Sequence, residues 1–184
     1  MPDQFLKLPL VQQAWMFAAR KHHGQTYPGT DLPYLVHIGS VLLALLPALT
    51  EHSGTPGFDS ELALCCALLH DTVEDTDTGL GELQEIFGDA VAAGVSALTK
   101  NKAIPSRKAM SESLSRIQTL PQEVWMVKLA DRIANLGVPP AHWSKEKCLS
   151  YAHEAQTILD ALGGASRQLS DTLASRILAW KSEK

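Results

Sequence analysis

The chain has 184 residues, of which 45% are hydrophobic and 20% are charged, a composition that is typical of folded globular proteins and excludes a disordered chain. The formal net charge of −4 provides no overall attraction to nucleic acid or to a membrane surface. The N-terminus lacks a signal peptide, and no apolar run is long enough to cross a bilayer. We therefore expect a cytoplasmic protein with no nucleic-acid or membrane partner, folded as a single domain over residues 1–184.

Apolar residues recur at helical spacing along most of the chain, and no run alternates as a strand would. Asp59 and Ser144 are expected N-caps, and Thr119-x-x-Gln122 resembles a capping box. The sequence predicts an all-α bundle of roughly eight or nine helices with no sheet. The expected helices cover about residues 10–23, 33–49, 59–75, 79–87, 89–98, 107–118, 122–136, 144–162 and 167–181.

An apolar run over residues 62–69 ends abruptly in His70, Asp71, Glu74 and Asp75. On a continuous helix, His70 would lie one turn from Glu74 and Asp71 one turn from Asp75. Three carboxylates packed this closely repel one another and raise their own pKa values, a cost that a bound cation relieves. The stretch therefore indicates half of a metal site, although the second acidic pair is also compatible with a solvated helix end.

Two polar residues on other predicted helices are candidates for the second half of the site. Asp131 lies beside an apolar face, where it needs either a metal or an ion pair with Lys128 or Arg132. His37 lies early in a core helix, where it is either structural or a ligand. Two imidazoles and two carboxylates suit Mn²⁺, Fe²⁺ or Zn²⁺ better than Ca²⁺. His22, on an apolar face, is expected to support the core rather than to bind metal.

Four spaced motifs carry a resemblance to a known family. They read Ala18-x-x-x-His22-x-Gly-Gln25, Pro33-Tyr-x-x-His37, His70-Asp-Thr-Val-Glu-Asp-Thr76 and Val127-Lys-Leu-Ala-Asp-Arg132-x-x-Asn135. Together they resemble the HD-domain hydrolases of the RelA/SpoT family, and most closely the small alarmone hydrolases, bacterial and metazoan, that lack a synthetase domain. The match covers roughly residues 14–160.

The resemblance implies an all-α HD fold and one bound Mn²⁺, in preference to Fe²⁺ or Zn²⁺. It implies that Glu74 and Asp75 act on the attacking water and that Asn135 and Tyr151 lie near a small-molecule nucleotide substrate. The implied reaction removes the 3′-pyrophosphate from (p)ppGpp, giving GDP or GTP and pyrophosphate. A homo-oligomer is compatible with the sequence. The implied metal ligands are His37, His70, Asp71 and Asp131.

The sequence departs from the family pattern where the base is expected to bind. The loop after Gln25 reads Thr26-Tyr27-Pro28-Gly29, where the guanosine hydrolases usually carry Arg-Lys, and the arginine that usually follows the motif asparagine is missing. Tyr27 is either a stacking platform for a base, worth about 1–3 kcal/mol, or a loop aromatic that covers the core. Lys102 belongs to a lysine-containing segment that either binds substrate phosphates or is simply solvated.

These departures leave two alternatives to alarmone hydrolysis. One is an HD phosphatase for another nucleotide, such as NADPH, ppApp or a nucleoside monophosphate. The other is a non-catalytic nucleotide-binding HD module. The second is disfavoured because all four expected metal ligands and both acidic residues are present in the sequence.

Overall fold

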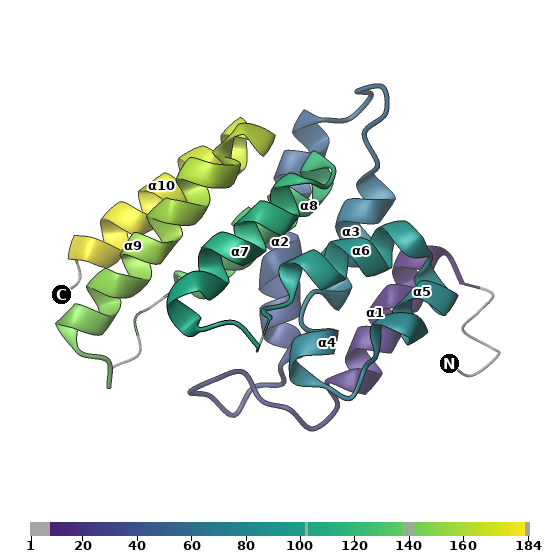
Figure 1. The fold of residues 1–184 in the computed structure, drawn as a ribbon, viewed down its shortest axis with the longest axis horizontal. Coiled ribbons are helices and arrows are strands. Elements are labelled where there is room, and N and C mark those ends of the chain that lie inside the picture. The colour runs from purple at the N-terminus through teal and green to yellow at the C-terminus, as the bar shows by residue number, and fades with distance from the viewer. Residues whose placement is uncertain (1–7, 102, 138, 140–141, 183–184) are drawn as a thin grey trace.

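The computed structural model describes residues 8–101, 103–137, 139 and 142–182, and over these residues it confirms the all-α architecture (Figure 1). The described residues contain no strand, only an isolated β-bridge between Thr26 and Pro33. None of the described helices is both long and apolar enough to cross a membrane. The helices are α1 (Leu10–Lys21), α2 (Leu35–Glu51), α3 (Ser60–Leu69), α4 (Thr72–Asp75), α5 (Leu80–Phe87), α6 (Asp89–Leu98), α7 (Ser106–Gln118), α8 (Gln122–Asn135), α9 (Lys145–Leu162), the 3₁₀-helix η1 (Gly163–Ala165) and α10 (Arg167–Ser182).

The α3 helix lies at the centre of the packing. It contacts α1, α2, α6 and α8, while α9 and α10 form a hairpin on one side of the molecule (Figure 1). Because α3 is enclosed by helices, it can be apolar all round, and its last five residues, 65–69, are all buried. The α2 helix packs against α3, α8 and α10, so that α2, α3 and α8 meet in one region of the core.

The contact between α3 and α6 depends on a glycine. A Cβ atom placed on Gly94 would lie 2.5 Å from Cys66 Sγ and 3.3 Å from Val124 Cγ2. Real side chains do not approach this closely, so the absence of a side chain lets α6 pack directly on α3.

Two of the three expected helix caps are present. The Asp59 side chain accepts a hydrogen bond from the Leu62 amide at 2.9 Å, and Ser144 accepts one from Lys147 at 3.2 Å. The capping box at Thr119 was a wrong prediction: Pro121 is the N-cap of α8, and the Thr119 hydroxyl donates to the Arg116 carbonyl at the end of α7 instead. Proline suits this position because it has no amide hydrogen to satisfy.

The central motif does not lie on one continuous helix. The α3 helix ends at Leu69 and α4 begins at Thr72, leaving His70 and Asp71 in the turn between them. The Thr72 hydroxyl donates to the Leu69 carbonyl at 2.7 Å. This carbonyl needs a partner outside the helix because the last carbonyls of an α-helix have no amide to accept from within it. The break separates the His-Asp pair from the acidic pair on α4.

Candidate metal centre

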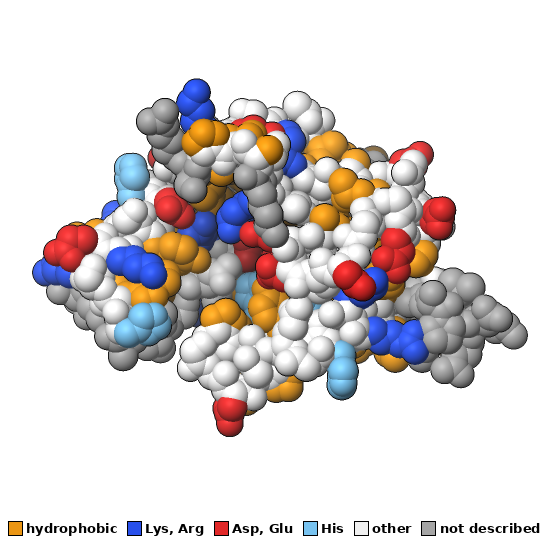
Figure 2. All heavy atoms as spheres, turned by 60° about the horizontal axis from the view of Figure 1, so that its bottom comes forward, with side chains coloured by type: hydrophobic (Ala, Val, Ile, Leu, Met, Phe, Trp, Pro, Cys, Tyr) orange, Lys and Arg blue, Asp and Glu red, His pale blue; other side chains and the backbone are white. Residues whose placement is uncertain are grey.

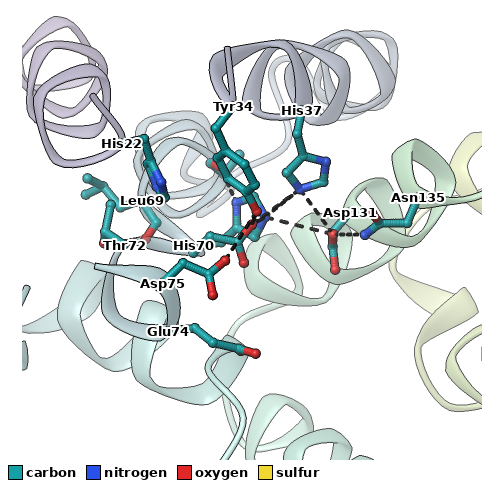
Figure 3. A network of polar contacts seen from close by, with 12 residues as sticks. His22, Tyr34, His37, Leu69, His70, Thr72, Glu74, Asp75, Asp131 and Asn135 are labelled. Atoms are coloured by element: carbon teal, nitrogen blue, oxygen red, sulfur yellow. Dashed lines mark hydrogen bonds and ion pairs between the residues drawn. The ribbon is translucent and has the colours of Figure 1, made fainter. Parts of the chain in front are cut away.

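Four side chains from three parts of the fold converge at the break between α3 and α4 (Figure 3). His37 comes from the first turn of α2, His70 and Asp71 from the turn, and Asp131 from α8. The two histidine Nε2 atoms lie 3.3 Å apart. Ligand atoms of His37, His70 and Asp131 all lie within 4.8 Å of one another, and Asp71 Oδ2 lies 3.3 Å from His37 Nε2 and 2.9 Å from His70 Nε2.

The orientation of His70 is set by its other ring nitrogen. Its Nδ1 lies 2.8 Å from the Ala67 carbonyl, which can only accept, so Nδ1 carries a proton and Nε2 faces the centre. Burial lowers the pKa of His70, but the adjacent Asp71 carboxylate outweighs this effect and raises the pKa to about 9. Without a cation, the imidazole is therefore protonated at neutral pH.

Asp131 forms the ion pair with Lys128 that its sequence context suggested, and its other oxygen lies near the two histidines. Its Oδ1 lies 3.6 Å from His37 Nε2 and accepts from Asn135 Nδ2 at 2.5 Å. Its Oδ2 accepts from the buried Lys128 ammonium at 3.1 Å. Burial opposes ionisation, but Lys128 lowers the pKa of Asp131 below its usual value. The carboxylate is therefore charged, with one oxygen directed at the histidines and the other held by the lysine.

The spacing of these atoms fits a divalent cation. Metal–ligand bonds of about 2.1 Å place neighbouring ligand atoms about 3.0–3.4 Å apart in an octahedral or tetrahedral shell. The contacts among the two imidazoles and two carboxylates span 2.9–3.9 Å. A set of two nitrogens and two oxygens, with both histidines almost fully buried, suits a transition-metal dication.

The second acidic pair lies one turn farther on, on α4. Burial, together with the negative charges of Asp71 and Glu74, raises the pKa of Asp75. Glu74 accepts hydrogen bonds from the Lys100 amide at 3.1 Å and from its ammonium at 3.3 Å. Asp75 therefore accepts a proton more readily than an ordinary aspartate, while Glu74 is hydrogen-bonded to Lys100 in the segment that follows α6.

These groups share a cleft of about 210 Å³. Figure 2 shows a hollow near the middle of this face, with acidic and basic side chains in its walls. Asn135 and Tyr151 lie in the cleft wall as expected. The cleft is lined by Tyr34, His37, His70, Asp71, Glu74, Asp75, Leu98, Lys100, Lys128, Asp131, Asn135 and Tyr151.

Of the other two expected substrate contacts, only Tyr27 belongs to the described residues. Tyr27 is not part of the cleft lining; its ring lies parallel to that of His37, with centroids 5.9 Å apart. Lys102 lies outside the described residues. His22 is buried and stacks on Tyr34 rather than facing the histidine pair.

The cleft also contains Tyr34 and Lys128, which the sequence did not indicate as site residues. Tyr34 lies three residues before His37, one helical turn away, a spacing that identifies it as a neighbour of the site. Lys128 is the ion-pair partner of Asp131, three residues farther on. Lys100 belongs to the lysine-containing segment that the sequence offers for substrate phosphates, and its contact with Glu74 joins residues 26 positions apart.

The two histidines and two aspartates that converge in this helical bundle provide ligand atoms suited to a divalent metal ion. Residues 14–168 match the family model described as HD domain. The chain belongs to this family and is a hydrolase of the HD class.

Named relatives extend over most of the chain. It is 32% identical over 167 residues to the guanosine-3′,5′-bis(diphosphate) 3′-pyrophosphohydrolase MESH1 of Danio rerio, covering 88% of this chain and 89% of the relative. It is 33% identical over 162 residues to the Homo sapiens protein of the same name, covering 85% and 87%. A solved structure titled as a metazoan orthologue of SpoT that hydrolyses ppGpp superposes with a TM-score of 0.78 at 25% identity, covering 92% and 94%.

Proposed function

We propose that this protein removes the 3′-pyrophosphate from guanosine 3′,5′-bis(diphosphate) or a closely related nucleotide, giving GDP or GTP and pyrophosphate. The observation that carries the proposal is the convergence of His37, His70, Asp71 and Asp131 beside a second acidic pair in one cleft. Relatives that span nearly the whole chain and are named for this reaction support the same substrate.

We infer that His37, His70, Asp71 and Asp131 hold one divalent ion, Mn²⁺ in preference to Fe²⁺ or Zn²⁺. When bound, such an ion polarises a phosphoryl oxygen and lowers the pKa of a water molecule toward about 7. Lys128 keeps Asp131 ionised, and the Ala67 carbonyl holds His70 in the orientation that a ligand requires.

In the proposed reaction, Asp75 takes a proton from the attacking water, and its raised pKa makes it a stronger base than an ordinary aspartate. The water oxygen bonds to the phosphorus that is attached to the ribose 3′ oxygen, and the bond between that phosphorus and the 3′ oxygen breaks. The 3′ oxygen then takes up a proton. Glu74, held by Lys100, orients the water beside Asp75.

The distribution of cations supports one orientation of the substrate. No lysine or arginine occurs between Lys21 and Lys100, so α2, α3 and α4 contribute neither residue to the cleft. Lys100, after α6, and Lys128, on α8, line the cleft. We propose that phosphate groups lie toward these two lysines, that Asn135 and Tyr151 contact the nucleotide, and that Tyr27, whose ring stacks with His37, offers an uncharged face to the base.

The absence of lysine and arginine from the loop sequence that carries Tyr27 also favours a second candidate within the same chemistry, an HD phosphatase that accepts other nucleotides such as NADPH or ppApp. An uncharged stacking surface accepts any base, because every base has an aromatic face.

We further propose that residues 1–184 form one hydrolase domain and that the protein is cytoplasmic. The single domain is supported by the packing of α10, most of which lies beyond the family match, against α2, α8 and α9.

The test is a substrate panel with the Mn²⁺-loaded protein. We expect pyrophosphate release from ppGpp, and Asp75→Asn should lower kcat by about 10²–10⁴-fold while the protein keeps its metal. Asp171→Asn, which changes an exposed carboxylate on α10, is the matched control. Release of orthophosphate alone, or turnover only of other nucleotides, would contradict the alarmone reaction and favour the second candidate.

A further inference from the structure

Tyr34 lies between the two halves of the acidic motif. Its hydroxyl donates to Asp71 Oδ2 at 2.6 Å and lies 3.4 Å from Asp75 Oδ2 (Figure 3). The same Asp71 oxygen faces the two histidines. One hydroxyl therefore contacts a proposed metal ligand and the proposed base, which are separated along the chain by the first residues of α4.

The ring of Tyr34 packs against His22, which lies at the end of α1. His22 is 2% exposed and stacks on it with centroids 4.7 Å apart and an interplanar angle of 23°. The Nδ1 atom of His22 pairs with Gln25 Oε1 at 2.8 Å, and Gln25 Nε2 donates to the backbone carbonyl of Asp75 at 2.8 Å. The loop after α1 thus supports the tyrosine ring and the end of α4 together.

We propose that Tyr34 is a positioning residue that fixes Asp71 and Asp75 relative to each other, with His22 and Gln25 as its support. The inference rests on the proposed function, which makes one carboxylate a metal ligand and the other a base. A carboxylate in a turn can rotate about its side-chain bonds, and a short hydrogen bond to a braced phenol removes that freedom. The cleft then keeps its acidic groups at a constant separation despite the break between α3 and α4.

Tyr34→Phe tests the proposal because it removes only the hydroxyl and keeps the ring on His22. We expect the Kd for Mn²⁺ to rise about 10-fold or more, because removing a group that orients a metal ligand typically costs 10–100-fold in affinity or activity. At saturating Mn²⁺, kcat should also fall about 10-fold or more, with KM changed less than about twofold. Mn²⁺ binding is measured by electron paramagnetic resonance, and thermal unfolding checks the fold.

Gln25→Ala separates the two roles. It removes the contacts with the Asp75 backbone and with His22 but keeps the hydrogen bond from Tyr34 to Asp71, so kcat should fall by a larger factor than Mn²⁺ affinity. Ser40→Ala is the matched hydroxyl deletion on α2; its hydroxyl donates to the Val36 carbonyl of the same helix, and both readouts should stay unchanged.

Two results would overturn the assignment. One is a folded Tyr34→Phe protein that binds Mn²⁺ as tightly as the wild type. The other is a kcat at saturating Mn²⁺ equal to that of the wild type, which would show that the hydroxyl does not position Asp75. If the wild type hydrolysed none of the nucleotides, the proposed function would fail, while the metal titration would still decide whether Tyr34 positions Asp71.

Discussion

His70 is held by opposing contacts at its two ring nitrogens. The Ala67 carbonyl holds one nitrogen, and the Asp71 carboxylate lies 2.9 Å from the other. In the absence of metal, the second contact favours the imidazolium, and the pKa of His70 rises to about 9 despite burial. A cation bound there takes the place of this proton, so metal and proton compete for one atom.

This competition predicts how the stability of the metal-free protein depends on pH. The folded-state pKa of His70, about 9, exceeds the unfolded value of about 6.5, so the stabilisation is complete below about pH 6.5 and is lost as the pH rises through about 9. We expect the free energy of unfolding in EDTA, measured with urea, to be roughly 1–3 kcal/mol lower at pH 9.5 than at pH 6.

His70→Gln is the control for this prediction, because glutamine cannot titrate. The free energy of unfolding of the variant should not show this decline between about pH 6 and about pH 9.5. If wild type and variant fall in parallel, other groups govern the alkaline destabilisation and the raised pKa is not its source.

The α3–α6 contact shows how one side chain can limit the packing of two helices. Cys66 is fully buried, and its sulfur occupies the space that a Cβ on Gly94 would need. Burial raises the pKa of the Cys66 thiol above its ordinary value, so it behaves as a small apolar group. This agrees with the buried position of α3 between four other helices.

Gly94→Ala is expected to destabilise the protein even though alanine favours helices. The added methyl meets Cys66 Sγ at 2.5 Å, and such overpacking typically costs about 1–3 kcal/mol, more than the roughly 1 kcal/mol that helix propensity offers. Gly81→Ala on α5 is the matched control, since its Cβ would have no neighbour within 4 Å. Urea unfolding should show a loss for the first variant only. Equal stability of the two variants would mean that α3 and α6 can move apart freely.

The proposed metal site links parts of the chain that are far apart in sequence. His37 and Asp131 are 94 positions apart, yet His37 Nε2 and Asp131 Oδ1 lie 3.6 Å from each other. They come from α2 and α8, which pack together in the core. An ion held there therefore connects α2, α8 and the end of α3, and the unfolded chain has no equivalent site.

Metal removal should consequently lower the thermal stability of the whole protein. At Mn²⁺ 100-fold above its Kd, binding adds about 2.7 kcal/mol, which raises Tm by about 5–10 °C for a chain of this size. Differential scanning calorimetry with and without EDTA measures the shift. Asp131→Asn should show little Mn²⁺-dependent shift. A wild-type Tm that does not respond to Mn²⁺ would contradict a site that joins the three segments.

Most of the fold could be predicted from the sequence, because the 3.6-residue period of apolar side chains is a local signal. The bounds of α5, α6 and α10 lie within one or two residues of those expected. Residues 70–76 likewise indicated metal-dependent chemistry through the crowding of charged groups at the end of an apolar run. Neither inference needed to know which helices are neighbours.

Packing between distant segments decided the rest. Asp71, in the turn after α3, accepts a hydrogen bond from Tyr34, which lies 37 positions earlier in the chain. Asp131 pairs one oxygen with Lys128 and has the other 3.6 Å from His37 Nε2, so the ion pair that the sequence offered as an alternative leaves the second oxygen beside the proposed metal site. Hydrogen bonds and ion pairs depend on distances between atoms, and for residues far apart in the chain those distances exist only once the helices have packed.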